Sequence, residues 1–450
     1  VVTGVQTCAL PIWTGKTMLG LEFLVRGAQA GSPGIMLTFE ERESDLRHYA
    51  RSFGWNTEAL EEQGLLALIG ARLQPDAILS GDFDLRGILA ILRQKAEELN
   101  AQRIVIDAPD VFLRLLDNIA KERAELHVLN DWLRDAGLTT VMTVKGESSG
   151  IFSSHYEFLE YMADCVIYLD QRVYEQVTTR RLRILKYRGS GYGRNEYPFG
   201  ITDDGVWIIP VTQTSLQHRG HGESLSSGVA RMDEILGGGY PRGSCALITG
   251  SSGTGKTTFA CSFALSAVNA GERVLYLDFE ESWDALSSCM LSPGIDLRPA
   301  HKSGRLRFLS AMPESQGIEE HLMSVYRTIE EFQPNHLVLD AISACRRMGS
   351  SHAAFDYLLR LVDHCKQHGI TCLLTNLTSA ADASQEITGI DLSSVIDTVV
   401  IVRNVEAHGG FKRELSVLKS RGRGHSNLIH EFHITDHGIV IAQKEASDDK

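Results

Sequence analysis

The chain has 450 residues, which exceeds one ordinary hydrophobic core and suits two domains of about 200 residues each. Its 43% hydrophobic and 22% charged residues are typical of a globular protein, and no apolar run reaches the roughly 18 residues of a membrane span. The formal net charge of −13 argues against nonspecific nucleic-acid binding, and eight scattered cysteines without a C-x-x-C pair argue against a zinc site or a disulfide framework. We therefore expect a cytoplasmic protein without a membrane or nucleic-acid partner.

The first half of the chain places polar and charged residues after short apolar runs. "TGKT" (14–17) opens a helical pattern, and "TFEER" (38–42) carries Glu40 and Glu41 just after an apolar run. "RIVIDA" (103–108) carries Asp107 at the end of another such run. Further on, "LKYRGSGYG" (185–193) holds two cations separated by one residue.

Each of these stretches returns in the second half, in the same order. The GKT of the first half recurs at 255–257, and TFEER recurs as "DFEES" (278–282), both 240 positions later. RIVIDA recurs as "HLVLDA" (336–341) and LKYRGSGYG as "LKSRGRGHS" (418–426), both 233 positions later. Matches in one order at a nearly constant offset indicate duplication of a domain-sized unit.

The polar stretch "TQTSLQHRGHGESL" (212–225) has no apolar periodicity and predicts the join between the two units. We therefore expect an N-terminal domain over residues 1–220 and a C-terminal domain over 221–450.

Short apolar runs in the second unit predict buried strands at 245–250, 274–280, 336–340 and 371–376. Helix-length segments separate them, among them an amphipathic stretch over 354–369 that ends in glycine. This alternation predicts an α/β fold, with a mainly parallel sheet flanked by helices in each unit.

The intact glycine-rich loop of the second half is the strongest functional signal. Gly250-x4-Gly255-Lys256-Thr257 follows a predicted strand and precedes a predicted helix, which is the context of a phosphate-binding P-loop. Backbone N–H groups and the helix N-terminus would face the phosphates, with Lys256 on the β- and γ-phosphates and the Thr257 hydroxyl on Mg²⁺. The alternative is a glycine-rich turn that binds nothing. The predicted nucleotide-binding residues are Gly250, Ser251, Ser252, Gly253, Thr254, Gly255, Lys256, Thr257 and Thr258, with Thr14, Gly15, Lys16 and Thr17 at the repeated position.

Two aspartates end predicted strands that should lie beside these loops. Asp340 ends "HLVLD", where a carboxylate suits Mg²⁺ directly or through water. Asp107 occupies the equivalent position, and Thr17 would supply the hydroxyl ligand in the first unit. The alternative is an aspartate that caps the following turn.

Adjacent glutamates follow another predicted strand in both units, Glu280–Glu281 and Glu40–Glu41. Neighbouring side chains on an extended backbone point to opposite faces, so one glutamate of each pair should face the γ-phosphate and orient or deprotonate the attacking group. The alternative is the acidic first turn of a helix.

Two cations lie near the end of a predicted antiparallel edge strand in each unit. Lys419 and Arg421 are in "GFKRELSVLKSRG", and Lys186 and Arg188 are in "TTRRLRILKYRG". They form either a solvated charged face or a cation pair that stabilises γ-phosphate charge in the adjacent subunit.

Taken together, these features resemble the RecA-like ATPases and, more narrowly, the double-domain KaiC ATPases of the circadian clock. The resemblance covers nearly the whole chain and is most specific at 186–199, 227–244, 313–322 and 386–400. It implies tandem RecA-like domains that form two-tiered hexameric rings, with Mg-ATP at subunit interfaces and signalling or clock proteins as partners. The residues to which it assigns roles are Glu280 and Glu281 in catalysis and Lys419 and Arg421 at the neighbour's nucleotide.

In that family the C-terminal tier transfers phosphate to hydroxyls near the subunit interface, and "ITGIDLSSVID" matches the acceptor stretch. Ser393 and Ser394 are adjacent there, with Thr388 five residues before Ser393. The local sequence alone predicts a turn or a helix cap. The resemblance implies phosphorylation sites.

The chain departs from the family at both ends. The glycine-rich front of the first loop is replaced, and Pro11 also lacks an N–H to donate. Since Glu40 and Asp107 are retained, we interpret residues 1–13 as a fragmentary or foreign start joined to a genuine domain, with a natural pseudo-site as the alternative. The family's longer C-terminal tail, which binds an activating partner, has no counterpart, so we do not expect that regulation. The four replaced loop positions are Leu10, Pro11, Ile12 and Trp13.

The leading hypothesis is a hexameric, Mg²⁺-dependent ATPase whose C-terminal domain autophosphorylates on Ser/Thr and signals through nucleotide and phosphorylation state. The alternative is an ATP-gated scaffold with slow hydrolysis and no kinase activity. A third hypothesis, a DNA-handling RecA relative, is disfavoured by the acidic charge balance.

Overall fold

The computed structural model describes residues 14–71, 85–113, 118–145, 157–174, 177–208, 223–315, 317–348, 351–378, 395–407 and 410–443. Leu10 to Trp13 and the three candidate phosphorylation sites, Thr388, Ser393 and Ser394, lie outside these ranges. The chain forms two compact units, one over residues 1–172 and 180–211 and the other over residues 173–179 and 212–450, and each unit is described by itself.

The first unit contains a parallel sheet in the strand order β2-β1-β3-β4 and a second sheet in the order β5-β6-β7-β8. Its elements are α1 (Lys16–Gln29), β1 (Gly34–Thr38), α2 (Glu43–Ser52), α3 (Thr57–Glu62), β2 (Leu66–Gly70), α5 (Leu85–Leu99), β3 (Arg103–Asp107), α6 (Asp110–Leu113), α7 (Ile119–Asp135), β4 (Thr139–Thr143), α8 (Glu157–Met162), β5 (Cys165–Tyr174), β6 (Val177–Tyr187), β7 (Glu196–Thr202) and β8 (Gly205–Ile208).

The parallel sheet forms because its strands are short, continuous apolar runs that helices cover. All five residues of β1 are buried. Leu21 and Leu24 of α1 pack with Met36 and Val105 in one core cluster of this unit. Burial of such side chains stabilises the fold by roughly 1.5–3 kcal/mol each.

The second unit is built on one sheet in the strand order β13-β12-β14-β15-β11-β16-β17-β18-β19. Its elements are β9 (Ser224–Leu225), α9 (Ala230–Ile235), β10 (Tyr240–Pro241), β11 (Cys245–Gly250), α10 (Lys256–Asn269), β12 (Val274–Asp278), α11 (Trp283–Cys289), α12 (Arg298–Lys302), β13 (Leu306–Ser310), the 3-10 helix η1 (Pro313–Ser315), α13 (Ile318–Phe332), β14 (His336–Asp340), the 3-10 helix η2 (Ile342–Met348), α14 (Ser351–Gln367), β15 (Thr371–Leu377), β16 (Thr398–Ala407), β17 (Gly410–Ser420), β18 (His430–Thr435) and β19 (Gly438–Ile441).

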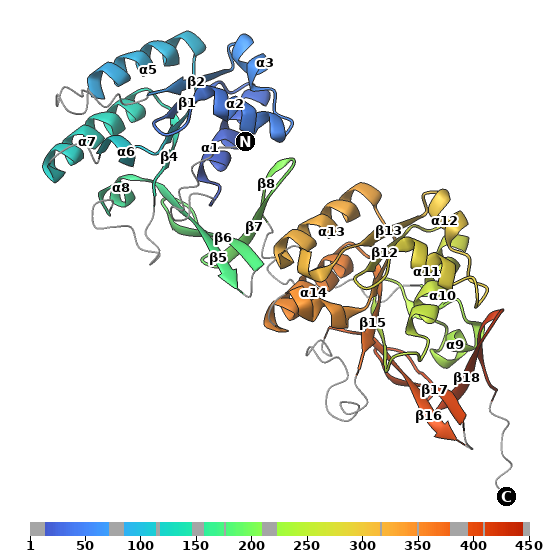
Figure 1. The fold of residues 1–450 in the computed structure, drawn as a ribbon. Coiled ribbons are helices and arrows are strands. Elements are labelled where there is room, and N and C mark those ends of the chain that lie inside the picture. The colour runs from blue at the N-terminus through green and yellow to red at the C-terminus, as the bar shows by residue number, and fades with distance from the viewer. Residues whose placement is uncertain are drawn as a thin grey trace, which may run out of the picture. The chain divides into compact units, whose positions relative to one another are not determined.

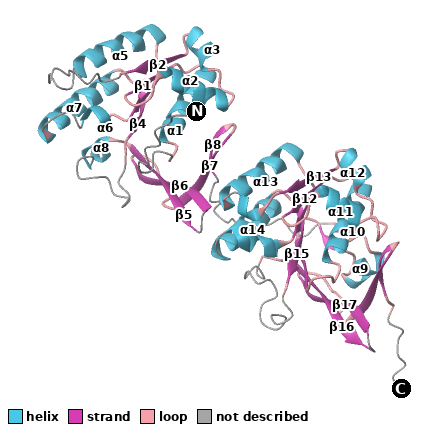
Figure 2. Cartoon of the chain, viewed as in Figure 1, coloured by secondary structure: helices cyan, strands magenta, loops and turns pink. Residues whose placement is uncertain are grey.

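The strands from β13 to β16 in this order are parallel, and β17, β18 and β19 extend the sheet in antiparallel pairing. Helices α10 and α11 lie on one side of the sheet, and α13 and α14 lie on the other (Figure 1). Helices and strands alternate through most of each unit, and strands β5 to β8 and β16 to β19 follow one another at its end, as Figure 2 shows. The predicted α/β fold with mainly parallel, helix-flanked sheets is therefore confirmed.

Strand direction in the second unit decides which residues meet. Gly250, Asp278 and Asp340 end the parallel strands β11, β12 and β14, so all three lie at the same edge of the sheet. Strand β17 runs the other way, and its residue Lys419 lies toward the opposite edge, in register with Val399 near the start of β16.

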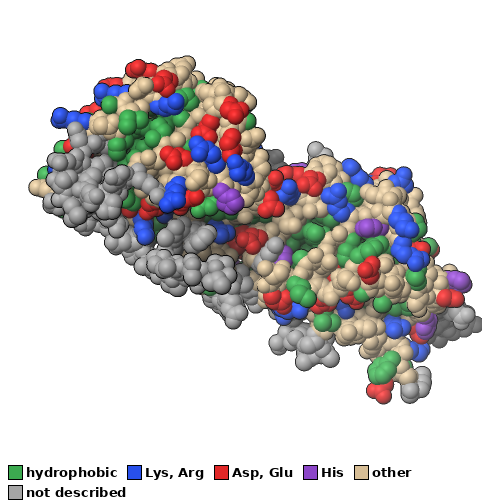
Figure 3. Space-filling model, turned by 45° about the horizontal axis from the view of Figure 1, so that its top comes forward, with side chains coloured by type: hydrophobic (Ala, Val, Ile, Leu, Met, Phe, Trp, Pro, Cys, Tyr) green, Lys and Arg blue, Asp and Glu red, His purple; other side chains and the backbone are tan. Residues whose placement is uncertain are grey.

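None of the helices in the described ranges is long and apolar enough to cross a membrane. On the face drawn in Figure 3, acidic and basic side chains are interspersed over both units.

Candidate nucleotide-binding sites

The glycine-rich loop of the second unit links the end of β11 to the start of α10. A Cβ on Gly250 would lie 2.1 Å from the Val402 carbonyl oxygen, and Gly255 caps α10 with a φ of 95° that only glycine adopts without strain. A Cβ on Gly255 would also lie 2.7 Å from Cδ1 of Ile434, whereas Gly253 faces open space. The loop backbone therefore packs closely on one side and leaves the other side open to a phosphate chain.

Lys256 lies folded back over this loop. Its Nζ donates a hydrogen bond to the Ser251 carbonyl at 2.8 Å, and the Thr254 hydroxyl donates to the same oxygen at 2.8 Å. Burial lowers the pKa of Lys256, against the attraction of Asp340 and Glu280. A poorly hydrated ammonium whose nearest acceptor is a neutral carbonyl is well suited to receive an anionic phosphate oxygen.

Asp340 is held at the end of β14 by two hydroxyls. Tyr276 donates to one carboxylate oxygen at 3.0 Å, and Thr375 donates to the other. The Thr257 hydroxyl, in the first turn of α10, and the Asp340 carboxylate are the hard oxygen donors that Mg²⁺ prefers. Within the described ranges no cluster of three or more His, Cys, Asp or Glu side chains could hold a metal ion. These residues therefore fit Mg²⁺ that arrives with nucleotide and keeps phosphate and water ligands.

The glutamate pair lies in the bend between β12 and α11, not on the extended backbone that the sequence suggested. Both Glu280 and Glu281 precede Ser282, the N-cap of α11, so they are not a helical first turn either. The backbone bends because the buried Asp278 carboxylate accepts hydrogen bonds from the amides of Glu280 and Glu281, at 2.8 and 2.7 Å. Partial burial, followed by repulsion from Asp340 and Glu280, raises the pKa of Glu281.

The first unit repeats this arrangement from Thr14 onward. Gly15 caps α1 with a φ of 85°, and its Cβ would lie 2.8 Å from Cδ1 of Ile201. The Thr17 hydroxyl donates to Asp107 at 2.9 Å, so the two predicted Mg²⁺ ligands of this unit are in contact. Burial raises the pKa of Asp107 and lowers that of Lys16.

The acidic side of this first site includes a residue that the sequence motifs missed. Asp110 is buried, and its charge favours the protonated form of Lys16. Burial, followed by repulsion from Asp110 and Asp107, raises the pKa of Glu40. The Glu41 amide donates to the Thr38 hydroxyl at 3.1 Å. No sequence signal marks Asp110, because it opens a short helix rather than ending a strand.

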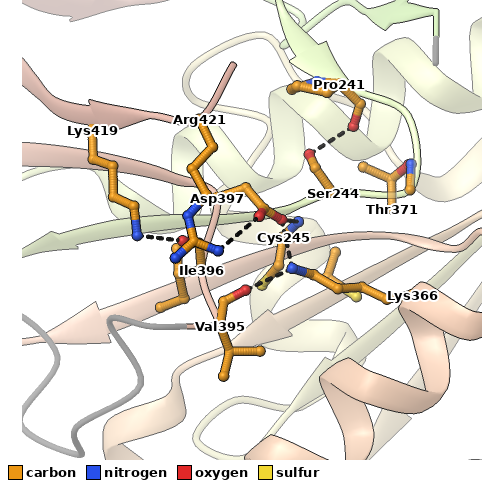
Figure 4. A network of polar contacts seen from close by, with 12 residues as sticks. Pro241, Ser244, Cys245, Lys366, Thr371, Val395, Ile396, Asp397, Lys419 and Arg421 are labelled. Carbon is orange, nitrogen blue, oxygen red and sulfur yellow. Dashed lines mark hydrogen bonds and ion pairs between the residues drawn. The ribbon is translucent and has the colours of Figure 1, made fainter. Parts of the chain in front are cut away.

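The cation pair of the second unit is not brought to the P-loop of its own chain. Figure 4 shows Lys419 donating to the Ile396 carbonyl, at 2.8 Å, and Arg421 beside Asp397, at 3.9 Å. At the other end of β17, Arg413 lies 3.4 Å from the Gly253 carbonyl of the P-loop. Lys419 lies six residues after Arg413 on this antiparallel strand, and six residues span about 20 Å. Lys419 is therefore about that far from the P-loop.

A buried ion pair fixes the chain next to these cations. Lys366 Nζ lies 2.7 Å from the Asp397 carboxylate and donates to the Val395 carbonyl at 2.7 Å (Figure 4). The side chains of Lys366 and Asp397 are only 7% and 5% exposed, and the Cys245 amide also donates to Asp397. Removing one partner of such a pair leaves a buried charge uncompensated. No sequence signal indicates this role, because a lysine in an amphipathic helix is typical of a solvated face.

The cations of the first unit bind main-chain carbonyls in the same manner. Lys186 Nζ donates to the Glu160 carbonyl at 2.6 Å, and Arg188 donates to the Tyr161 carbonyl at 2.8 Å. Arg188 also lies 3.4 Å from Asp164. Both units thus hold their cation pair on the chain segment that enters a long strand, β5 in the first unit and β16 in the second.

Comparison with known proteins finds matches over most of the chain. A family model described as "ATPase: KaiC" matches residues 12–213 and again residues 225–446. The circadian clock protein KaiC2 of Synechocystis is 36% identical over 433 residues, which is 95% of this chain and 76% of that protein. The circadian clock oscillator protein KaiC of Parathermosynechococcus lividus is 34% identical over 95% of this chain and 80% of its own length. The KaiC3 protein of Synechocystis is 32% identical over 96% of this chain and 86% of its own length.

Proposed function

The chain belongs to the KaiC family of ATP-binding ATPases, and from that premise we propose that its C-terminal unit also transfers the γ-phosphate of ATP to serine hydroxyls of the same protein. The proposed assembly is a homo-hexameric ring in the cytoplasm, with domains over 1–220 and 221–450. Its nucleotide and phosphorylation state would signal to partner proteins, including clock proteins. We propose no membrane or nucleic-acid partner.

The observation that carries the proposal is the separation of the two halves of the site. Lys256, Asp340 and the glutamate pair lie at one edge of the sheet, whereas Lys419 and Arg421 lie toward the other edge. One chain therefore presents phosphate-binding and acidic groups at one end and cations at the other. Copies arranged head to tail in a ring would join the two ends into a complete site.

The proposed reaction assigns each group one task. Lys256 and the loop amides hold the β- and γ-phosphates, and Glu280 or Glu281 accepts the proton of the attacking hydroxyl. The hydroxyl oxygen bonds to the γ-phosphorus as the bond to the bridging β–γ oxygen breaks, which yields ADP and a phosphoserine, or free phosphate when water attacks. Mg²⁺, when bound with ATP, neutralises charge on the phosphate oxygens. Lys419 and Arg421 of the adjacent subunit would stabilise the charge on the transferred group.

The acceptor assignment rests on the family resemblance and on the contacts of the three residues that come directly after the serines. The carbonyls of Val395 and Ile396 accept hydrogen bonds from Lys366 and Lys419, and the Asp397 carboxylate forms an ion pair with Arg421 at 3.9 Å. The chain next to Ser393 and Ser394 is thus tied to Lys419 and Arg421, the two cations that are proposed to reach a neighbouring nucleotide. Such an anchor would place hydroxyls near that nucleotide.

We expect long incubation with Mg-ATP to place phosphate on Ser393 or Ser394, and less on Thr388. Intact mass followed by phosphopeptide mapping measures this directly. Each phosphate adds about −1.5 to −2 charge at pH 7, so a charge-sensitive gel provides an independent readout.

Mapping that finds all three hydroxyls unmodified while ATP is being hydrolysed contradicts the kinase assignment. That result favours the second candidate, an ATP-gated scaffold with slow hydrolysis, and leaves the ATPase assignment intact.

Arg421→Ala is expected to slow hydrolysis by roughly tenfold to a thousandfold while ATP binding stays close to that of the parent, because the residue acts on a neighbour's nucleotide. Mixing this variant with Glu280→Gln/Glu281→Gln should restore part of the activity, since some interfaces then combine two intact halves. Hydrolysis rates of the separate and mixed proteins measure the effect.

Arg423→Ala is the matched control, because Arg423 lies two residues further on and donates to the Ser224 hydroxyl. It should retain the parent rate. Parent-like hydrolysis by Arg421→Ala would show that the cation does not act across an interface.

A further inference from the structure

Asp278 ends β12 and is a buried residue, 3% exposed. One of its carboxylate oxygens accepts the amides of both Glu280 and Glu281, at 2.8 and 2.7 Å. We propose that Asp278 is a positioning residue that fixes the backbone of the glutamate pair for phosphoryl transfer in the C-terminal unit. This inference rests on the proposed function, because it assumes that the pair is catalytic.

Three successive amides in this segment have defined acceptors at the edge of the sheet. The Phe279 amide donates to the Asp340 carbonyl at 3.1 Å, and the next two amides donate to Asp278. The Asp278 carbonyl in turn accepts from the Ala311 amide at 3.2 Å. The bend that carries Glu280 and Glu281 is therefore tied to both neighbouring strands, β14 and β13.

Asp278 occupies a location that is unfavourable for a carboxylate. Asp278 is the register partner of Asp340 on the adjacent strand, so two buried carboxylates end neighbouring strands. Burial raises the pKa of Asp278 to about 7, although its two amide donors act in the opposite direction. Burying a carboxylate costs stability, and the two amide hydrogen bonds that Asp278 accepts offset part of that cost.

The first unit provides an internal comparison. Thr38 occupies the equivalent place at the end of β1, in register with Asp107. Its hydroxyl accepts from the Glu41 amide, at 3.1 Å. In the C-terminal unit one Asp278 oxygen accepts the backbone amides of both glutamates. In the N-terminal unit the Thr38 hydroxyl accepts the backbone amide of the second glutamate, Glu41. The two units therefore constrain their glutamate pairs differently.

The first test compares three substitutions at this position in the full chain, using steady-state ATP hydrolysis with Lys16→Ala present throughout to weaken nucleotide binding by the first unit. Asp278→Ala, which removes the acceptor, should lower kcat by about tenfold or more with KM for ATP changed less than about twofold, because misplacement of a reacting group affects the chemical step. Asp278→Asn keeps an acceptor oxygen and should recover most of kcat. Asp278→Thr, which copies Thr38, should fall between them.

The second test asks which half of the site Asp278 serves. If it acts through the glutamate pair, Asp278→Ala mixed with Arg421→Ala should regain activity, and Asp278→Ala mixed with Glu280→Gln/Glu281→Gln should not. A residue that only stabilises the fold would not separate the two mixtures in this way.

Thr371→Val is the matched control, because Thr371 is a buried acceptor of a backbone amide, that of Gly243, at the opposite edge of the sheet. It should lower the free energy of unfolding by about 1–3 kcal/mol and leave kcat unchanged. Parent-like kcat in Asp278→Ala would overturn the inference, as would an Asp278→Asn variant as slow as the alanine variant. If Glu280→Gln/Glu281→Gln itself keeps the parent rate, the proposed function fails instead.

Discussion

Lys256→Ala is expected to weaken ATP binding by the C-terminal unit by roughly tenfold to a hundredfold, because it removes the cation that we propose contacts the β- and γ-phosphates. In the structure the Lys256 ammonium donates a hydrogen bond to the Ser251 carbonyl. A phosphate oxygen would replace this neutral acceptor with an anionic one. The loop itself should survive, because the Thr254 hydroxyl still donates to that carbonyl. Titration calorimetry with a slowly hydrolysed ATP analogue and Mg²⁺ measures the change.

Binding by the first unit must be separated from this effect, so the titration is repeated in a Lys16→Ala background. Lys302→Ala serves as the control, since Lys302 is an exposed lysine at the end of α12. It should bind ATP like the parent. Equal affinities of the parent and Lys256→Ala proteins would contradict the assignment of the loop as a nucleotide site.

Glu280→Gln/Glu281→Gln is expected to slow ATP hydrolysis by roughly a hundredfold to ten thousandfold, which is the usual contribution of a general base. Glutamine preserves the size of both side chains. The backbone amides of residues 280 and 281 can still donate hydrogen bonds to the Asp278 carboxylate. ATP binding should therefore persist while the chemical step is lost. Single-turnover measurements at saturating ATP isolate that step, and phosphate incorporation should fall in parallel.

Glu330→Gln/Glu331→Gln makes the same double change on an exposed face of α13 and is the control for lost surface charge. It should hydrolyse ATP at the parent rate. Hydrolysis that stays within about twofold of the parent in Glu280→Gln/Glu281→Gln would remove the pair from the mechanism and would point to another base.

Much of the fold was predictable because it depends on short-range patterns. The apolar runs at 245–250 and 336–340 are strands with the predicted bounds. The amphipathic stretch over 354–369 is helix α14, which begins three residues earlier and ends two residues earlier than predicted. Repetition of these patterns also revealed the duplication, which the two family matches reflect.

The glutamate pair shows where local reasoning failed. An extended backbone was expected through Glu280, but β12 ends at Asp278 and the chain bends. The comparison of "TFEER" with "DFEES" contained the signal, since Thr38 is replaced by Asp278 between the repeats. This difference could be interpreted only once the structure showed that the Asp278 side chain accepts hydrogen bonds from the backbone amides of Glu280 and Glu281.

The sequence by itself determined the α/β alternation, the duplication and the glycine-rich loop between a strand and a helix, because strand, helix and loop preferences act between residues that are close in the chain. Only the tertiary structure decided that Asp278 and Asp340 end neighbouring strands, and that Lys366 pairs with Asp397. It also decided that Lys419 lies about 20 Å along β17 from the end beside its own P-loop. These relations depend on strand order and direction, which are set by hydrogen bonds and packing between segments far apart in sequence.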